Sequence, residues 1–100
     1  RRLDNLALYD TVSSQLELTD YQKRRGRQLL DGFNMNRVGY SVVLVSFVIS
    51  AYVCRDDQRI YHPLRDDKNN DGLFVSYADG LSENKDQIAA AYNRVTEKLP

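Results

Sequence analysis

The sequence has few of the residues that most often perform catalysis or bind metals. Cysteine and histidine occur once each, as Cys54 and His62. A single cysteine excludes an intramolecular disulfide and any zinc site built from several cysteines. The chain also has no Gly-rich phosphate loop and no pair of carboxylates in an apolar setting. We therefore expect a protein without enzymatic activity, cofactor, metal or small-molecule substrate.

Glycine, proline and excess charge are scarce as well. Five Gly and two Pro argue against a disordered or fibrous chain. Basic and acidic residues number 14 each, and this zero net charge argues against a strongly cationic, histone-like protein. The apolar content of 42% over 100 residues suffices for one hydrophobic core, so residues 1–100 are predicted to form a single domain. The chain begins at Arg1 with no signal-peptide pattern, so we expect a piece of a longer, cytoplasmic protein.

Two amphipathic helices are predicted in the first third of the chain. Within residues 3–16, apolar side chains recur at spacings of mostly three and four, which is typical of a helix with one apolar side. Thr19 is a favourable N-cap for a second helix, and Asp20 in its first turn suits the helix dipole. This second helix is predicted to run to about Phe33, with Gly32 near its end.

Residues 38–54 are apolar and contain no charged side chain. The segment is too long for a typical strand, so it is predicted to be a helix that is buried all round at the centre of a bundle. Cys54, at its end, is then expected to be a buried, unreactive thiol. Arg37 and Arg55 also bracket the segment as they would a short transmembrane helix. Its length is at the lower limit of about 17–25 residues for crossing a bilayer, and it contains serines and tyrosines, so we favour the buried helix and expect no membrane contact.

The last part of the chain is predicted to contain a polar loop and two helices. Residues 56–72 form the loop, which includes His62, and a short helix follows at about 73–79. Gly80 then turns the chain, and Ser82 is the expected N-cap of a helix over 83–99. The sequence thus predicts an all-α, compact five-helix domain with a hydrophobic central helix.

The polar loop contains a partial calcium-binding motif. Asp67, Asn69, Asp71 and Gly72 match the first half of an EF-hand loop. The twelfth position, where the motif requires a bidentate Glu, is Ala78. We therefore interpret the motif as a turn rich in Asn and Asp.

The predicted second helix carries a basic cluster that is a candidate for phosphate contacts. At 100° per residue Arg25 points away from the other members, while Asp20 and Asp31 lie one turn from the cluster and can pair with it. The cluster is therefore either a solvated, salt-bridged helix surface or part of a DNA-binding surface. Its candidate residues share one face: Lys23, Arg24 and Arg27.

Residues 73–99 have the pattern of a helix-turn-helix unit, which places the start of its second helix in the DNA major groove. Asn and Gln can pair with adenine, and Arg or Lys with guanine. Acidic neighbours at the same end would repel phosphates. The candidates for base contacts are Asn84, Lys85, Gln87 and Arg94.

The order of elements resembles the cyclin-box fold, in particular a core repeat of archaeal-type transcription factor B. Residues 14–20 are similar to the junction of the first two helices of that repeat. Ala51-Tyr52-Val53-Cys54-Arg55 resembles the end of its central helix, and residues 73–99 resemble its final short-helix, turn and long-helix unit. The central helix is bulkier than in that family, the loop 56–72 is longer, and a second repeat and a zinc ribbon are missing.

The resemblance implies a helical module that binds DNA or docks on a protein. We therefore expect a non-enzymatic, transcription-related module that binds double-stranded DNA. The alternative is a protein-interaction module of the same fold that does not bind DNA.

Overall fold

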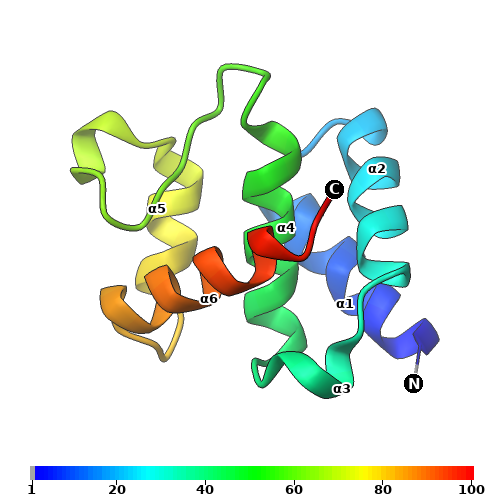
Figure 1. The fold of residues 1–100 in the computed structure, drawn as a ribbon. Helices are drawn as coiled ribbons and strands as arrows, with labels where there is room; N and C mark the ends of the chain where they lie inside the picture. Colours follow the sequence, from blue (N-terminus) through cyan, green and yellow to red (C-terminus); the bar gives the residue numbers. More distant parts are fainter. Residues whose placement is uncertain (1) are drawn as a thin grey trace.

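Helix α4 (Val42–Cys54) passes through the middle of the structure, and the other helices surround it (Figure 1). The structure is a computed structural model that describes residues 2–100. Over this range the chain is helical and contains no strand, which confirms the all-α prediction. The remaining elements are α1 (Arg2–Gln15), α2 (Asp20–Asp31), α3 (Met35–Val38), the 3-10 turn η1 (Asp67–Asn69), α5 (Gly72–Asp79) and α6 (Lys85–Glu97).

The burial of α4 confirms the predicted central helix. Ten of its thirteen residues are buried, and α1, α2 and α6 all pack against it. Helices α1 and α2 lie on one side of α4, α5 lies on the other, and α6 crosses it (Figure 1). Among residues 2–100, no helix has both the length and the apolar character that are needed to span a bilayer.

Aromatic rings join the two sides of the domain through α4. Phe47 of α4 is fully buried and makes edge-on contacts with Tyr61 and Phe74, with ring centroids 5.2 and 5.7 Å away. The Tyr77 ring stacks on Phe47 at 5.5 Å. Because aromatic rings bury large apolar areas, this cluster fixes α5 and the preceding loop against the central helix.

The structure has six helices in residues 2–100 rather than the five predicted, because the apolar middle segment is interrupted. Gly39 adopts a left-handed conformation with φ of 80°, and it ends the short helix α3. The Ser41 side chain then accepts a hydrogen bond from the Leu44 amide at 3.1 Å and begins α4 at Val42 instead of Val38. A glycine in this conformation followed by a serine N-cap is a local stop and restart signal.

Three other predicted helix limits were wrong, and one of them is the end of α6, which lies at Glu97 rather than Leu99. Helix α2 ends at Asp31 rather than near Phe33. Helix α6 is capped by Asn84, not Ser82, and therefore starts at Lys85. The predicted N-cap Thr19 of α2 is confirmed, since its hydroxyl accepts from the Gln22 amide at 3.2 Å.

Helices α1 and α2 approach each other closely at Gly26. The fully buried ring of Tyr9 occupies the space where a side chain would begin. A Cβ atom on residue 26 would lie 1.6 Å from the Tyr9 Oη and 2.4 Å from its Cζ. Only glycine fits this position, and the contact fixes which side of α2 faces the core.

Replacing Phe47 by Ala should lower the free energy of unfolding by about 3–5 kcal/mol, because it leaves a cavity at the centre of the aromatic cluster. Urea unfolding followed by circular dichroism measures this loss. Phe33→Ala, at a partly exposed ring, is the control and should cost less. Equal losses at the two positions would contradict the central role of Phe47.

Gly26→Ala should lower the free energy of unfolding by about 1–3 kcal/mol, since the new methyl group overlaps the Tyr9 ring. The matched control is Gly72→Ala, where a Cβ meets no atom within 4 Å. The control should change the stability by no more than about 0.5 kcal/mol. Thermal unfolding of both variants tests this prediction, and a neutral Gly26→Ala would refute the close contact.

Candidate nucleic-acid interface

The outward face of α2 carries polar, cationic and aromatic side chains together. The buried residues Gln22, Gly26 and Leu30 follow one another at intervals of four and form the inner side of the helix. On the outer side Tyr21 is 65% exposed. The exposed residues of α2 are Asp20, Tyr21, Arg24, Arg25, Gln28 and Asp31. The term α2 face is used here for four of them: Tyr21, Arg24, Arg25 and Gln28.

The cations of α2 fall into two groups. The first group is Arg27, which is half-buried and forms an ion pair with Asp10 of α1. A second ion pair between the same two helices joins Asp31 of α2 to Arg2 of α1. Lys23, Arg24 and Arg25 form no ion pair with any carboxylate of residues 2–100. Neither intrahelical pair that the sequence suggested is formed. Arg27 and Asp31 pair with residues of α1 instead, and Asp20 forms no ion pair within residues 2–100.

This arrangement changes the membership of the basic face. Arg24 and Arg25 are both exposed, whereas Lys23 and Arg27 are half-buried. Arg25, which the helical wheel had pointed elsewhere, therefore lies on the same exposed surface as Arg24. The hydrogen bond from Arg2 lowers the pKa of Asp31, so the carboxylate at the end of α2 stays ionised and engaged.

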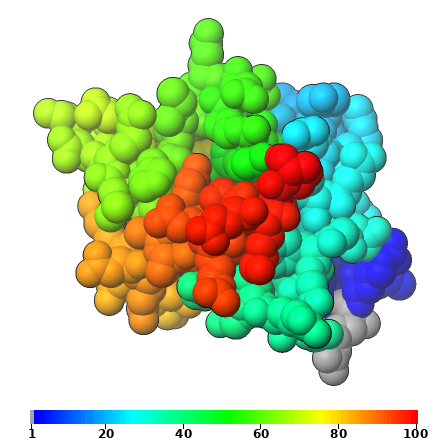
Figure 2. Space-filling model, in the orientation of Figure 1, coloured from blue at the N-terminus to red at the C-terminus, as the bar shows by residue number. Residues whose placement is uncertain are grey.

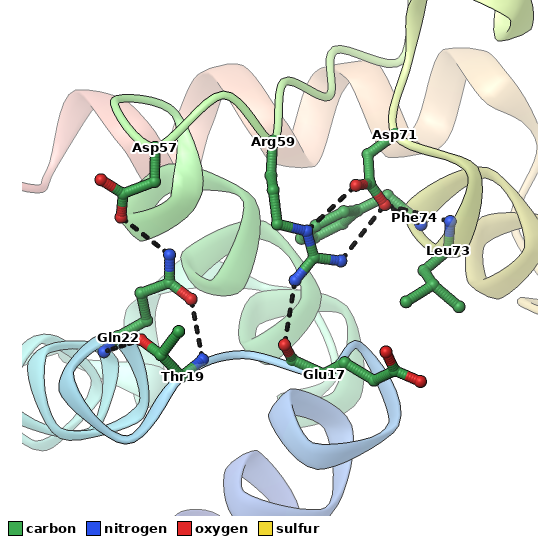
Figure 3. Close-up of polar contacts among 8 residues, drawn as sticks. All are labelled: Glu17, Thr19, Gln22, Asp57, Arg59, Asp71, Leu73 and Phe74. Atoms are coloured by element: carbon green, nitrogen blue, oxygen red, sulfur yellow. Dashed lines mark hydrogen bonds and ion pairs between the residues drawn. The ribbon is translucent and has the colours of Figure 1, made fainter.

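A capping box and a cross-link to the loop fix the start of α2 (Figure 3). The Thr19 amide donates to the Gln22 Oε1 at 2.9 Å, while the Gln22 amide donates to the Thr19 hydroxyl. The Gln22 Nε2 also donates to the Asp57 carboxylate at 2.7 Å. The two side chains of the capping box thus each satisfy one free amide at the helix start, and buried Gln22 also ties the helix to the loop after α4.

Arg59 links the turn between α1 and α2 to the start of α5 (Figure 3). Its Nη1 donates to the backbone carbonyl of Glu17 at 3.2 Å, and Glu17 holds a left-handed φ of 57°. Its Nε and Nη2 donate to the two carboxylate oxygens of Asp71 at 3.0 and 3.2 Å. The pair is mostly buried and has the bidentate geometry that suits a guanidinium and a carboxylate.

Asp71, which belongs to the calcium-like motif, has a structural role as the N-cap of α5. Its Oδ1 accepts from the amides of Leu73 and Phe74 and caps α5. Burial acts to raise the pKa of Asp71, but the hydrogen bonds from Arg59 and the Phe74 amide, with the Arg59 charge, hold it below its usual value. No group of three or more His, Cys, Asp or Glu side chains within residues 2–100 is arranged to hold a metal ion.

Three of the four predicted base-contact residues near α6 are already engaged within the domain. Asn84 and Gln87 form a capping box, with hydrogen bonds of 2.8 and 2.9 Å between their side chains and each other's amides. Lys85 lies 3.4 Å from the carboxylate of Asp67. Arg94, two turns further along, is exposed and forms no ion pair in the described part of the chain.

The two potentially reactive side chains lie apart from the α2 face. Cys54 is fully buried, and burial raises the pKa of its thiol to about 11. The His62 ring contacts the edge of Tyr92 with centroids 4.8 Å apart. His62 belongs to the loop between α4 and α5. A pocket of about 190 Å³ beside this loop is lined by Tyr61 of the loop, by Asp79 and other residues of α5, and by the start of α6.

Comparisons with known protein families, with curated proteins and with solved structures find no match to this chain.

Sequence reasoning missed Tyr21, Arg25 and Gln28 as members of the exposed face. The usable signal was Gly26, because a glycine inside a helix indicates a close approach to another element. With Gly26 turned inward, the residues on the far side follow from the helix period.

Asp71→Asn should lower the free energy of unfolding by about 1–2 kcal/mol at neutral pH, because it removes the charge that pairs with Arg59 but keeps a capping side chain. The lowered pKa of folded Asp71 means that its contribution is present above the unfolded pKa of about 3.9. The contribution disappears as the pH falls through the folded pKa. Urea unfolding across this pH range should show the variant and the parent converging in acid.

Asp67→Asn is the control for this experiment, since its pair with Lys85 is exposed and contributes about 0–1 kcal/mol. A loss for Asp71→Asn that does not change with pH would mean that the charge has no part in the junction.

Proposed function

We propose that this domain is a non-enzymatic, transcription-related module that binds nucleic acid through the α2 face. The observation that supports the proposal is the exposure of Arg24 and Arg25 beside Lys23, with none of the three paired to a carboxylate of residues 2–100. Cations that internal ion pairs do not neutralise are available for phosphates. Tyr21 on the same face adds an aromatic surface.

The charge distribution allows such binding despite the zero net charge. Four cations of residues 2–100 serve internal pairs, as Arg27 does with Asp10 and Arg59 with Asp71. The exposed cations outside α2 that form no such pair are spread over several elements: Arg37, Arg55, Arg65, Lys68, Arg94 and Lys98. The α2 face therefore carries a local positive charge that the overall balance hides. With few phosphate contacts, we expect weak binding by the isolated domain and a modest dependence on salt.

The cyclin-box resemblance is part of this proposal. The observations that support it are a central apolar helix with other helices around it and the α5–α6 unit that follows. If α5 and α6 acted as a helix-turn-helix, α6 would contact the bases. The use of the Asn84 and Gln87 side chains in the capping box favours α2 for nucleic-acid contacts instead.

The double variant Arg24→Ala/Arg25→Ala should weaken binding to random duplex DNA. The slope of log affinity against log salt should become shallower by about 0.9 for each phosphate that the variant no longer neutralises. Fluorescence anisotropy of a labelled duplex, titrated at several salt concentrations, measures both quantities.

The matched control is Arg65→Ala/Lys68→Ala, which removes two exposed cations and so changes the net charge equally. These residues lie in the loop around η1, on the far side of the domain from α2 (Figure 1). Equal effects of the two double variants would show a dependence on net charge rather than on the α2 face. A parent domain without salt-dependent binding in dilute buffer would refute the proposed function.

A second candidate function is docking on a protein, without DNA binding. Its supporting observation is a set of exposed apolar side chains near the start of α5: Ile60, Leu64 and Leu73. The Asp71 amide donates to the Ile60 carbonyl at 2.8 Å and brings the first of these residues next to α5. In the binding assay this function predicts no effect of the α2 variants on DNA behaviour.

A further inference from the structure

We infer that α2 enters the major groove of duplex DNA and reads bases with Arg24, Arg25 and Gln28. This inference rests on the proposed function and adds to it the class of nucleic acid and the residues that set sequence preference. It assigns base reading to α2 instead of α6.

The shape of the domain around α2 permits this docking. Helix α2 packs on α4 and α1 through its inner side, and it runs along the edge of the molecule (Figures 1 and 2). A helix with its side chains is about 10–12 Å wide, and the major groove is about 12 Å wide. An outer helix face without a covering element can therefore enter the groove, whereas binding of a single strand typically uses a groove that follows its backbone.

The composition of the α2 face suits base edges as well as phosphates. Its members occupy positions i, i+3, i+4 and i+7 from Tyr21, so their side chains point the same way. An arginine pairs with the O6 and N7 of guanine through two hydrogen bonds, and a glutamine pairs with the N6 and N7 of adenine. Gln28 carries no charge and adds little to phosphate attraction, so its place beside two arginines indicates base reading.

The position of α2 is also fixed firmly enough for this purpose. Base reading requires side chains on a rigid element. The Tyr9 ring against Gly26 fixes the rotation of the helix, and Gln22 ties its start to Asp57. At the start of α6, by contrast, the side chains of Asn84 and Gln87 accept hydrogen bonds from each other's backbone amides and are therefore not available to contact a base.

Selection from a randomised duplex pool tests the inference, with the parent domain and with Gln28→Ala. We expect the parent to enrich a short motif that contains guanine and adenine. Gln28→Ala should weaken the preference at one adenine position by roughly tenfold or more and should leave the salt slope unchanged. Gln15→Ala, at an exposed glutamine at the end of α1, is the matched control and should keep the motif.

The contrary outcomes separate this inference from the proposed function. If the parent enriches no motif while Arg24→Ala/Arg25→Ala still reduces the salt slope, α2 contacts phosphates only and the inference is wrong. A single strand that outcompetes the duplex, or a motif that disappears in Arg94→Ala but persists in Gln28→Ala, also overturns it. If the folded parent binds no duplex at any salt concentration, the proposed function itself fails. Circular dichroism of each variant shows that the helices are intact.

Discussion

The burial of α4 on all sides is the constraint on which the rest of the structure depends. A helix with ten of thirteen residues buried has no side left for water. The helices α1, α2 and α6 must therefore pack around it, each with its apolar side inward. Phe47 extends this core to α5 through the aromatic cluster. The surfaces that remain for a partner are the outer sides of the surrounding helices, and among them the α2 face carries exposed cations beside an exposed tyrosine ring.

The sequence predicts the features that depend on neighbouring residues. The uncharged run before Cys54 indicates the buried helix, and Thr19 indicates the start of α2. The start of α4 was missed although its signal is also local, because the apolar run outweighed Gly39 and Ser41. Ion pairs between elements depend on the packing angle of the helices, and no spacing rule along the chain gives that angle. The charge on Arg27 meets Asp10 of another helix for this reason.

The candidate site likewise combines features that neighbouring residues determine with features that helix packing determines. Sequence patterns predicted the basic cluster on α2, but which of its residues are exposed depends on Gly26 and the Tyr9 ring. This single close contact turns α2 so that Arg25 meets solvent and Arg27 meets α1. At α6 the sequence pattern was ambiguous in another way. Polar side chains at a helix start can serve either a ligand or the helix itself, and here the capping box uses Asn84 and Gln87.

The loop between α4 and α5 is held by hydrogen bonds within it as well as by the contacts of Arg59 and Asp71 near its ends. The Asn70 side chain exchanges two hydrogen bonds of 3.0 Å with the backbone of His62. Residues 63–69 therefore form a small loop whose two ends are held together. Each doubling of such a loop costs only about 0.6 kcal/mol of closure entropy, so this tip can accept added residues. Insertions outside it, next to Arg59 or Asp71, would separate α5 from the turn between α1 and α2.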